Sequence, residues 1–221
     1  HVALALGAGK PTLLDLPNGL ARGVRMASDF LMALQLTGAA KTDSIANLQL
    51  RLPAVVIGGG LTAIDTATEA MAYYPIQVEK FLHRYEALCA EIGEAALRSE
   101  WSKAETEIAD EFINHARAIR MERERAKAEN DKPKLSDLIN QWGGVTLAYR
   151  RRLIDSPSYT LNHEEVEKAL EEGIRFAETL TPSAIDVDQM GHVEAIRLKD
   201  GDGKEHVLPA RAVLVAAGTK P

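Results

Sequence analysis

The chain has 221 residues, of which 46% are hydrophobic and 26% charged, and its formal net charge is −6 at pH 7. This length suits one large domain, or a smaller domain that carries an insertion. The acidic balance argues against a general nucleic-acid-binding protein, which carries a basic face. No apolar run reaches the roughly 18 residues that a membrane span requires. The single cysteine, Cys89, has no disulfide partner within the chain and no metal-site spacing, which fits a reducing, cytoplasmic location. We therefore expect a cytoplasmic protein. From the charge and the apolar runs we expect neither a nucleic-acid partner nor a membrane partner.

The two ends of the chain have similar sequences. Residues 6–11 read LGAGKP and residues 216–221 read AAGTKP, and both follow apolar runs typical of buried strands. We interpret them as equivalent strand ends that bracket a segment of a longer protein. Chance similarity between two buried strands is the alternative.

Residues 23–38 have apolar side chains at helical spacing, including Val24, Phe30 and Leu34, and Gly38 is expected to end that helix. A short apolar strand at residues 54–57 then leads into three glycines. The next predicted helix covers residues 62–74 and places Ile64 and Met71 on one face.

Residues 75–140 differ in composition, being rich in Glu, Lys, Arg and Ala with almost no glycine. Two apolar stripes indicate two long amphipathic helices packed as a hairpin. Ser102 and Glu105 are expected to form a capping box at the start of the second helix, and the sequence ENDKPK is expected to end it.

After this insertion, GGVTLAYRRR at residues 143–152 predicts a second strand. A helix at residues 162–173 is expected to direct Val166, Ala169 and Leu170 inward, and three short strands and a closing strand at residues 212–216 follow it. The order predicts an α/β fold: a Rossmann-like, three-layer dinucleotide-binding domain with a parallel sheet, an antiparallel β-meander and a helical-hairpin insertion.

The three glycines fit the dinucleotide pattern G-x-G-x-x-G/A, between a strand and a helix as that pattern requires. Gly58 permits the tight turn, Gly60 lets the backbone approach a pyrophosphate, and Ala63 allows close packing of helix and strand. The helix N-terminus then offers free N–H groups to the phosphates. No Gly-Lys-Ser/Thr follows, which excludes a nucleoside-triphosphate loop.

The second strand ends in arginines at the position where NAD enzymes carry Asp or Glu. Arg150 and Arg151 favour a 2′-phosphate, so we predict NADPH rather than NADH as the cofactor. A solvated arginine run is the alternative. A methyltransferase is disfavoured, because a ribose-binding acid is expected at that position. The predicted cofactor contacts are Gly58, Gly59, Gly60, Leu61, Thr62, Ala63, Arg150, Arg151 and Gly218, and no catalytic or metal-binding residue is predicted.

Four segments together resemble the pyridine-nucleotide domain of the glutamate synthase small-subunit family, which includes a related module of dihydropyrimidine dehydrogenase. They are VVIGGGLTAIDTA, VTLAYRRR, EEVEKALEEGIRF and the terminal AAGTKP. The resemblance implies an NADPH domain inserted into an FAD domain of the same parent chain. Residues 1–52 would then hold the end of an FAD-domain strand and a crossover segment. Residues 53–221 would form the NAD(P)H-binding domain, with the insertion at residues 75–142.

The same resemblance implies an electron-entry role, in which NADPH passes a hydride to FAD and iron–sulfur clusters carry electrons to a downstream catalytic subunit. The FAD site is not in this segment, so we expect the segment alone to be inactive. The chain departs from the family at Leu61, where Asn or Asp is usual, and in its insertion. These departures motivate an alternative: a degenerate Rossmann domain that binds no cofactor and uses its insertion for assembly or partner docking. In either case we predict that the insertion offers a surface for self-association or for a partner.

Overall fold

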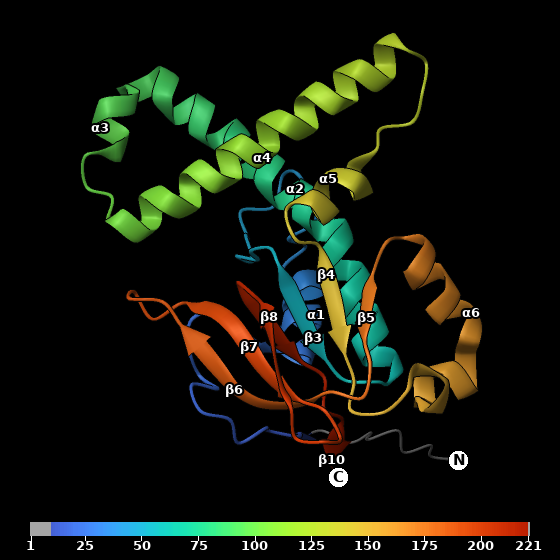
Figure 1. Cartoon of the computed structure of the whole chain (residues 1–221). Helices are drawn as coiled ribbons and strands as arrows, with labels where there is room; N and C mark the ends of the chain where they lie inside the picture. Colours follow the sequence, from blue (N-terminus) through green and yellow to red (C-terminus); the bar gives the residue numbers. More distant parts are fainter. Residues whose placement is uncertain (1–9, 221) are drawn as a thin grey trace, which may run out of the picture.

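A five-stranded parallel sheet forms the centre of the computed structural model, which describes residues 10–220 (Figure 1). The strand order is β2-β9-β3-β4-β5, and every neighbouring pair is parallel. The strands are β2 (Val24–Met26), β3 (Ala54–Ile57), β4 (Val145–Ala148), β5 (Arg175–Ala177) and β9 (Ala212–Val215). The second strand predicted after the insertion is therefore confirmed as β4, directly beside β3.

Each face of this sheet has its own core, because successive side chains of a strand point to opposite sides. Val56, Leu147 and Leu214 pack against helices, whereas Val55 and Val213 pack against the meander. The helical layer contains α1 (Ala27–Leu36), the first half of α2 (Leu61–Ile92) and α6 (Pro157–Glu171). The meander is antiparallel and consists of β6 (Thr181–Val187), β7 (Val193–Lys199) and β8 (Glu205–Pro209). These layers confirm the predicted three-layer fold with its antiparallel meander.

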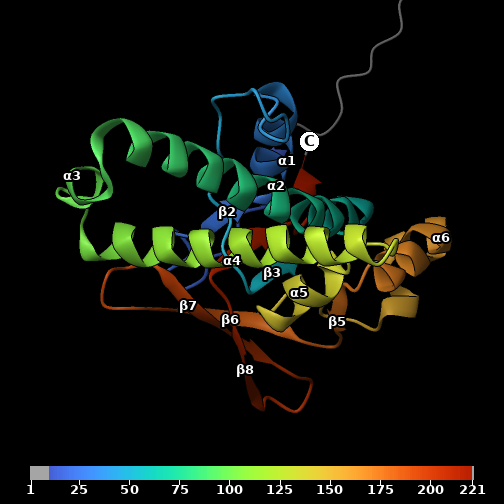
Figure 2. The same cartoon turned by 90° about the horizontal axis from the view of Figure 1, so that it is seen from above.

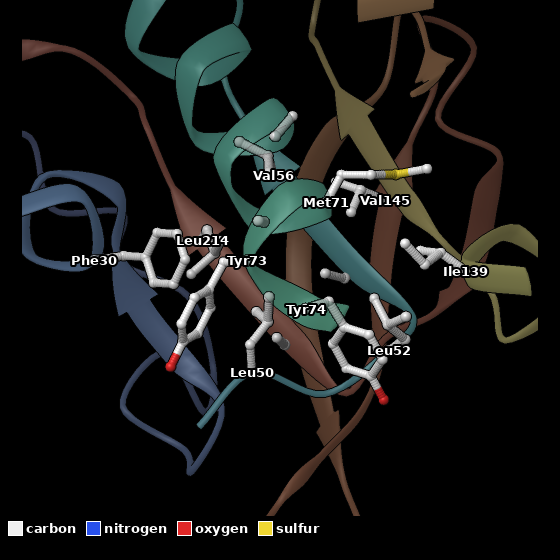
Figure 3. Packing of buried hydrophobic residues seen from close by; sticks show 14 of the residues in the cluster. Phe30, Leu50, Leu52, Val56, Met71, Tyr73, Tyr74, Ile139, Val145 and Leu214 are labelled. Atoms are coloured by element: carbon white, nitrogen blue, oxygen red, sulfur yellow. The ribbon is translucent and has the colours of Figure 1, made fainter. Parts of the chain in front are cut away.

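Helix α2 joins the sheet to the insertion without a break. The helix continues through Pro75. Proline inside a helix costs about 3 kcal/mol, because it lacks the N–H for one hydrogen bond and its ring crowds the preceding turn. Burial of Tyr73 and Tyr74 on either side of Leu50 offsets that cost (Figure 3). The insertion therefore begins inside a helix that is already anchored on the sheet, and not at a new element.

The rest of the insertion packs back along α2 as a hairpin. It consists of α3 (Glu94–Arg98), α4 (Lys103–Ala128) and α5 (Leu135–Gln141), and Figure 2 shows α2 and α4 side by side. Leu82 of α2 and Phe112 of α4 are buried in the core that the helical layer shares. Both hydrogen bonds of the predicted Ser102–Glu105 capping box are present. The two apolar stripes thus mostly cover each other.

Three local predictions need correction. Val24 lies in strand β2, paired with Val213 of β9, because it follows a glycine turn and extends the sheet edge. Leu170 is half-exposed and does not point into the core. Helix α6 begins at Pro157, with non-helical backbone at Asn162 where the sequence predicted its start, because the preceding Ser156 caps an additional first turn.

The two similar end segments lie next to each other where the structure describes them. Strand β1 (Lys10–Pro11) pairs antiparallel with β10 (Thr219–Lys220). The strand predicted before residue 10 lies outside the described residues. No helix within residues 10–220 is long and apolar enough to span a membrane.

Candidate functional site: the glycine loop at the carboxyl edge of the sheet

The loop Gly58–Gly60 connects β3 to α2 at the edge where the parallel strands end. The Gly58 N–H donates to the Ala148 carbonyl at the end of β4, and a Cβ built on Gly58 would lie 2.4 Å from the carbonyl oxygen of Ala216. Only glycine fits there, because the ends of β3, β4 and β9 converge on this residue. The predicted role of Gly58 in a tight turn agrees with this packing.

Gly59 is fixed from two sides by the segment that follows β4. A Cβ at Gly59 would lie 2.3 Å from the ring of Tyr149. The Gly59 carbonyl accepts hydrogen bonds from the Ser158 hydroxyl at 3.0 Å and the Ser158 N–H at 3.3 Å. The Ser158 hydroxyl lies 3.0 Å from that of Ser156, and both serines are fully buried. This network fixes the orientation of the Gly59–Gly60 peptide.

Gly60, in contrast, is open. It is the N-cap of α2 with extended backbone (φ −95°, ψ 175°), and a Cβ at this position would meet no atom within 4 Å among the described residues. Helix α2 has neither a side-chain cap nor an acidic residue in its first turn. The N–H groups of Leu61 and Thr62 therefore lack intrahelical partners and lie at the positive end of the helix dipole, whereas the Ala63 N–H donates to the Gly60 carbonyl at 2.9 Å. Leu61 and Thr62 are exposed beside this opening, while Ala63 is fully buried against the sheet.

The arginines that follow β4 differ in their pairing. Arg152 binds Asp155 at 2.8 Å, and this contact holds the pKa of the Asp155 carboxyl below its usual value. Arg150 and Arg151 are exposed and form no ion pair with any residue that the structure describes. The Arg151 carbonyl accepts from the Thr179 N–H at 3.1 Å, which anchors the backbone of this turn. Two uncommitted guanidinium groups thus lie on the segment that packs against Gly59.

Gly218 and Asp65 differ from these residues in backbone and charge. Gly218 has a positive φ of 92°, and its carbonyl accepts from the Thr12 N–H; its predicted contact with a cofactor stays a prediction. Asp65, in the first turns of α2, has a raised pKa because burial disfavours its charge and Glu165 of α6 adds repulsion.

Sequence reasoning missed Ser156 and Ser158, and it assigned no role to Tyr149. The Ser-Pro-Ser run held a usable signal, because serine at the N-cap followed by proline at N1 marks a helix start. That signal predicts the position of the first turn of α6. It does not predict the hydrogen bond across 99 residues to Gly59.

The geometry suits binding of an extended anion. Within residues 10–220 there is no cluster of His, Cys, Asp and Glu side chains that could hold a metal ion. The open N-terminus of α2 fits a pyrophosphate, and Arg150 and Arg151 fit a further phosphate group.

No protein-family model matches the chain. It is 43% identical over 196 residues to the uncharacterized protein RP006 of Rickettsia prowazekii (strain Madrid E), a match that covers 89% of this chain and 25% of that protein. Over 93 residues, 35% of this chain, it is 36% identical to the putative oxidoreductase AegA of Escherichia coli K12 and 31% identical to the glutamate synthase [NADPH] small chain of the same organism. These matches cover 14% and 19% of the two E. coli proteins. The chain thus spans a quarter or less of the length of each relative.

Among solved structures, the chain is similar to thioredoxin reductase of Lactococcus lactis. The match covers 97% of this chain and 43% of the thioredoxin reductase chain, with 15% identity and a TM-score of 0.48.

The similarity to the Rickettsia protein extends into the insertion. The part of the chain that it leaves unmatched is much shorter than the insertion, so the similarity must extend through most of the helical hairpin.

Proposed function

We propose that this chain is the NADPH-binding domain of a flavin-dependent oxidoreductase. It presents NADPH for hydride transfer to an FAD held by another domain of the same protein, as the electron-entry module of a glutamate synthase-like enzyme. The observation that carries the proposal is the open, uncapped α2 N-terminus at Gly60, on a loop that contacts the segment bearing two unpaired arginines. Similarity to part of a glutamate synthase [NADPH] small chain supports it.

In this assignment each part of the site has a defined task. Gly60, Leu61 and Thr62 hold the pyrophosphate through backbone N–H groups. Gly58, Gly59 and Ala63 give the loop its shape, because the Gly58 N–H is bonded to Ala148 and the Ala63 N–H to Gly60. Arg150 and Arg151 bind the 2′-phosphate. Bound NADPH supplies the hydride, while the residues of this chain bind and orient the cofactor.

The relatives of this chain support the presence of an FAD domain in the same protein, because the chain spans a quarter or less of the length of each relative. The further partners in this proposal are an iron–sulfur protein or a downstream catalytic subunit in the cytoplasm.

The test is a calorimetric titration of the full-length protein with NADPH and with NADH, comparing wild type with Arg150→Gln/Arg151→Gln. A hydrogen bond to a charged group contributes about 1.5–3 kcal/mol, so we expect NADPH affinity to fall by about tenfold or more while NADH affinity stays the same. Arg152→Gln is the matched control, because Arg152 is already paired with Asp155.

Three outcomes count against parts of the proposal. An equal loss for both cofactors would remove Arg150 and Arg151 from the 2′-phosphate site. An equal loss of NADPH affinity in Arg152→Gln would show that the overall positive charge of this segment, and not a specific contact of Arg150 or Arg151, affects binding. Failure of the wild-type protein to bind either cofactor would favour the degenerate Rossmann domain, whose insertion serves assembly or docking.

A further inference from the structure

A second charged site lies at the opposite edge of the parallel sheet, where the strands begin. It is a cavity of about 270 Å³ between the starts of β2 and β9 and the segment that leads into β3. Strands of four residues are about 13 Å long, which separates the cavity from the glycine loop. In Figure 1 this edge lies on the side of the insertion, away from the chain ends.

The lining of this cavity is strongly basic. Arg22, Arg25, Arg51 and Arg211 line it together with His192, and no carboxylate belongs to the lining. Arg51 is bound to Glu111 of α4, with nitrogen–oxygen distances of 2.5 and 3.2 Å. Among the described residues, the other three arginines form no ion pair. Such a concentration of positive charge is unusual in a chain whose net charge is −6.

The backbone forces these arginines together. Gly23 has a φ of +103°, and a Cβ there would lie 2.7 Å from the Arg211 carbonyl oxygen, so only glycine allows the two segments to approach. The Arg22 N–H donates to Gly191 and its carbonyl accepts from Val193. The Arg211 N–H donates to the Pro53 carbonyl at 2.7 Å. The backbones of Arg22 and Arg211 are therefore held close together, and their like charges repel one another, although Asp188 lies near enough to Arg211 to offset part of that repulsion.

One polar atom of the lining has no partner. The Nδ1 atom of His192 is buried and makes no hydrogen bond within the described residues, and the nearest Asp188 oxygen is 3.7 Å away. Buried polar atoms are normally satisfied, so this imidazole nitrogen beside a basic cavity is an exception within the described residues. The inner wall is apolar, because Phe30, Leu50 and Leu214 are almost fully buried there.

We propose that this cavity binds a small organic anion with at least two negative charges and a short apolar part. Guanidinium groups form paired hydrogen bonds with carboxylate and phosphate, and three unpaired arginines suit a multivalent ligand better than a single carboxylate. The volume lies just below the usual range for small-molecule pockets, which limits the ligand to a compact molecule. This site is separate from the proposed NADPH site.

The experiment titrates phenyl phosphate and citrate separately into the full-length protein by calorimetry at low ionic strength. The test variant is Arg25→Gln/Arg211→Gln, and the control is Arg120→Gln/Arg123→Gln, which removes the same charge from two solvent-accessible ion pairs of α4, outside both arginine sites. We expect saturable binding of at least one probe to wild type, a loss of about tenfold or more in the test variant, and no change in the control.

Thermal unfolding provides a second readout. Because the substitutions relieve repulsion, the test variant without anion should unfold at or above the wild-type temperature, and the probe should stabilise only wild type and control. Arg22→Gln, at an exposed position, replaces the test variant if that protein does not fold.

Other results would overturn the proposal. These are no saturable binding to wild type, an equal loss in the control variant, or binding of an Asp-rich peptide without binding of either small probe. The last result would identify the cavity as a docking site for a protein segment.

Discussion

The Gly60→Ala substitution separates cofactor binding from folding. Gly60 has extended backbone that alanine adopts freely, and the added methyl would meet no described atom within 4 Å. Loss of glycine flexibility in the unfolded chain stabilises the protein, whereas alanine is a poorer N-cap, so we expect the free energy of unfolding to change by only about 0.5 kcal/mol. The methyl nevertheless occupies the space through which a pyrophosphate would approach the α2 N-terminus. Loss of one charge-assisted hydrogen bond weakens binding by about 1.5–3 kcal/mol, or roughly 10- to 150-fold.

The assay combines calorimetric titration with NADPH and chemical unfolding of the same preparation. Gly201→Ala is the matched control, because Gly201 lies in the β7–β8 turn and its added Cβ also meets no described atom within 4 Å. We expect unchanged stability in both variants and weakened binding only in Gly60→Ala. Unchanged NADPH affinity in a folded Gly60→Ala protein would refute the reasoning, because the phosphates could not then lie against this backbone.

Three further predictions concern the support of the loop and the insertion. Ser158→Ala should lower both stability, by about 1–2 kcal/mol, and NADPH affinity in unfolding and titration experiments, because the buried Gly59 carbonyl loses its hydroxyl donor. Thr160→Ala is the control, because its hydroxyl bonds to Ser156 and not to Gly59, and an equal loss of NADPH affinity there would contradict the prediction. His115 donates to or accepts from the Tyr74 hydroxyl at 2.6 Å and has a pKa lowered by burial. The unfolded state therefore binds a proton more readily than the folded state, and the free energy of unfolding should fall as the pH drops below about 6.5. Unfolding measured at pH 7.5 and 5.5 should show a weaker pH dependence for His115→Phe than for wild type. An equal pH dependence would show that His115 is not the group responsible. Leu88 and Ile92 are 43% and 52% exposed on the insertion, so Leu88→Glu/Ile92→Glu should reduce the sedimentation mass; a wild-type monomer would rule out self-association.

The candidate site was only partly predictable from the sequence. Gly58, Gly60 and Ala63 occupy the positions that the glycine pattern requires, since a turn from a strand into a helix restricts which residues fit. Ser158 could not be predicted, because it bonds to a carbonyl 99 positions away and nothing local in Ser-Pro-Ser specifies that partner. The basic cavity was missed for the same reason. Arg22 and Arg25 lie far in the sequence from Arg211, and they come near it only because β2 pairs with β9 and Gly23 allows a close approach to the Arg211 carbonyl.

The sequence by itself determined the elements whose signals are local. The apolar runs of β3, β4 and β9, the capping box of α4 and the turns of the meander all depend on residues within a few positions of one another. Three features depend on tertiary structure alone. They are the position of β2 in the sheet, the partial exposure of Leu170 and the continuation of α2 through Pro75. In each case a preference worth a kilocalorie or a few was outweighed by contacts between distant segments, such as the burial of Tyr73 and Tyr74 around Leu50. Local patterns therefore specified the strands and the glycine loop, whereas long-range packing determined which charges came together at each edge of the sheet.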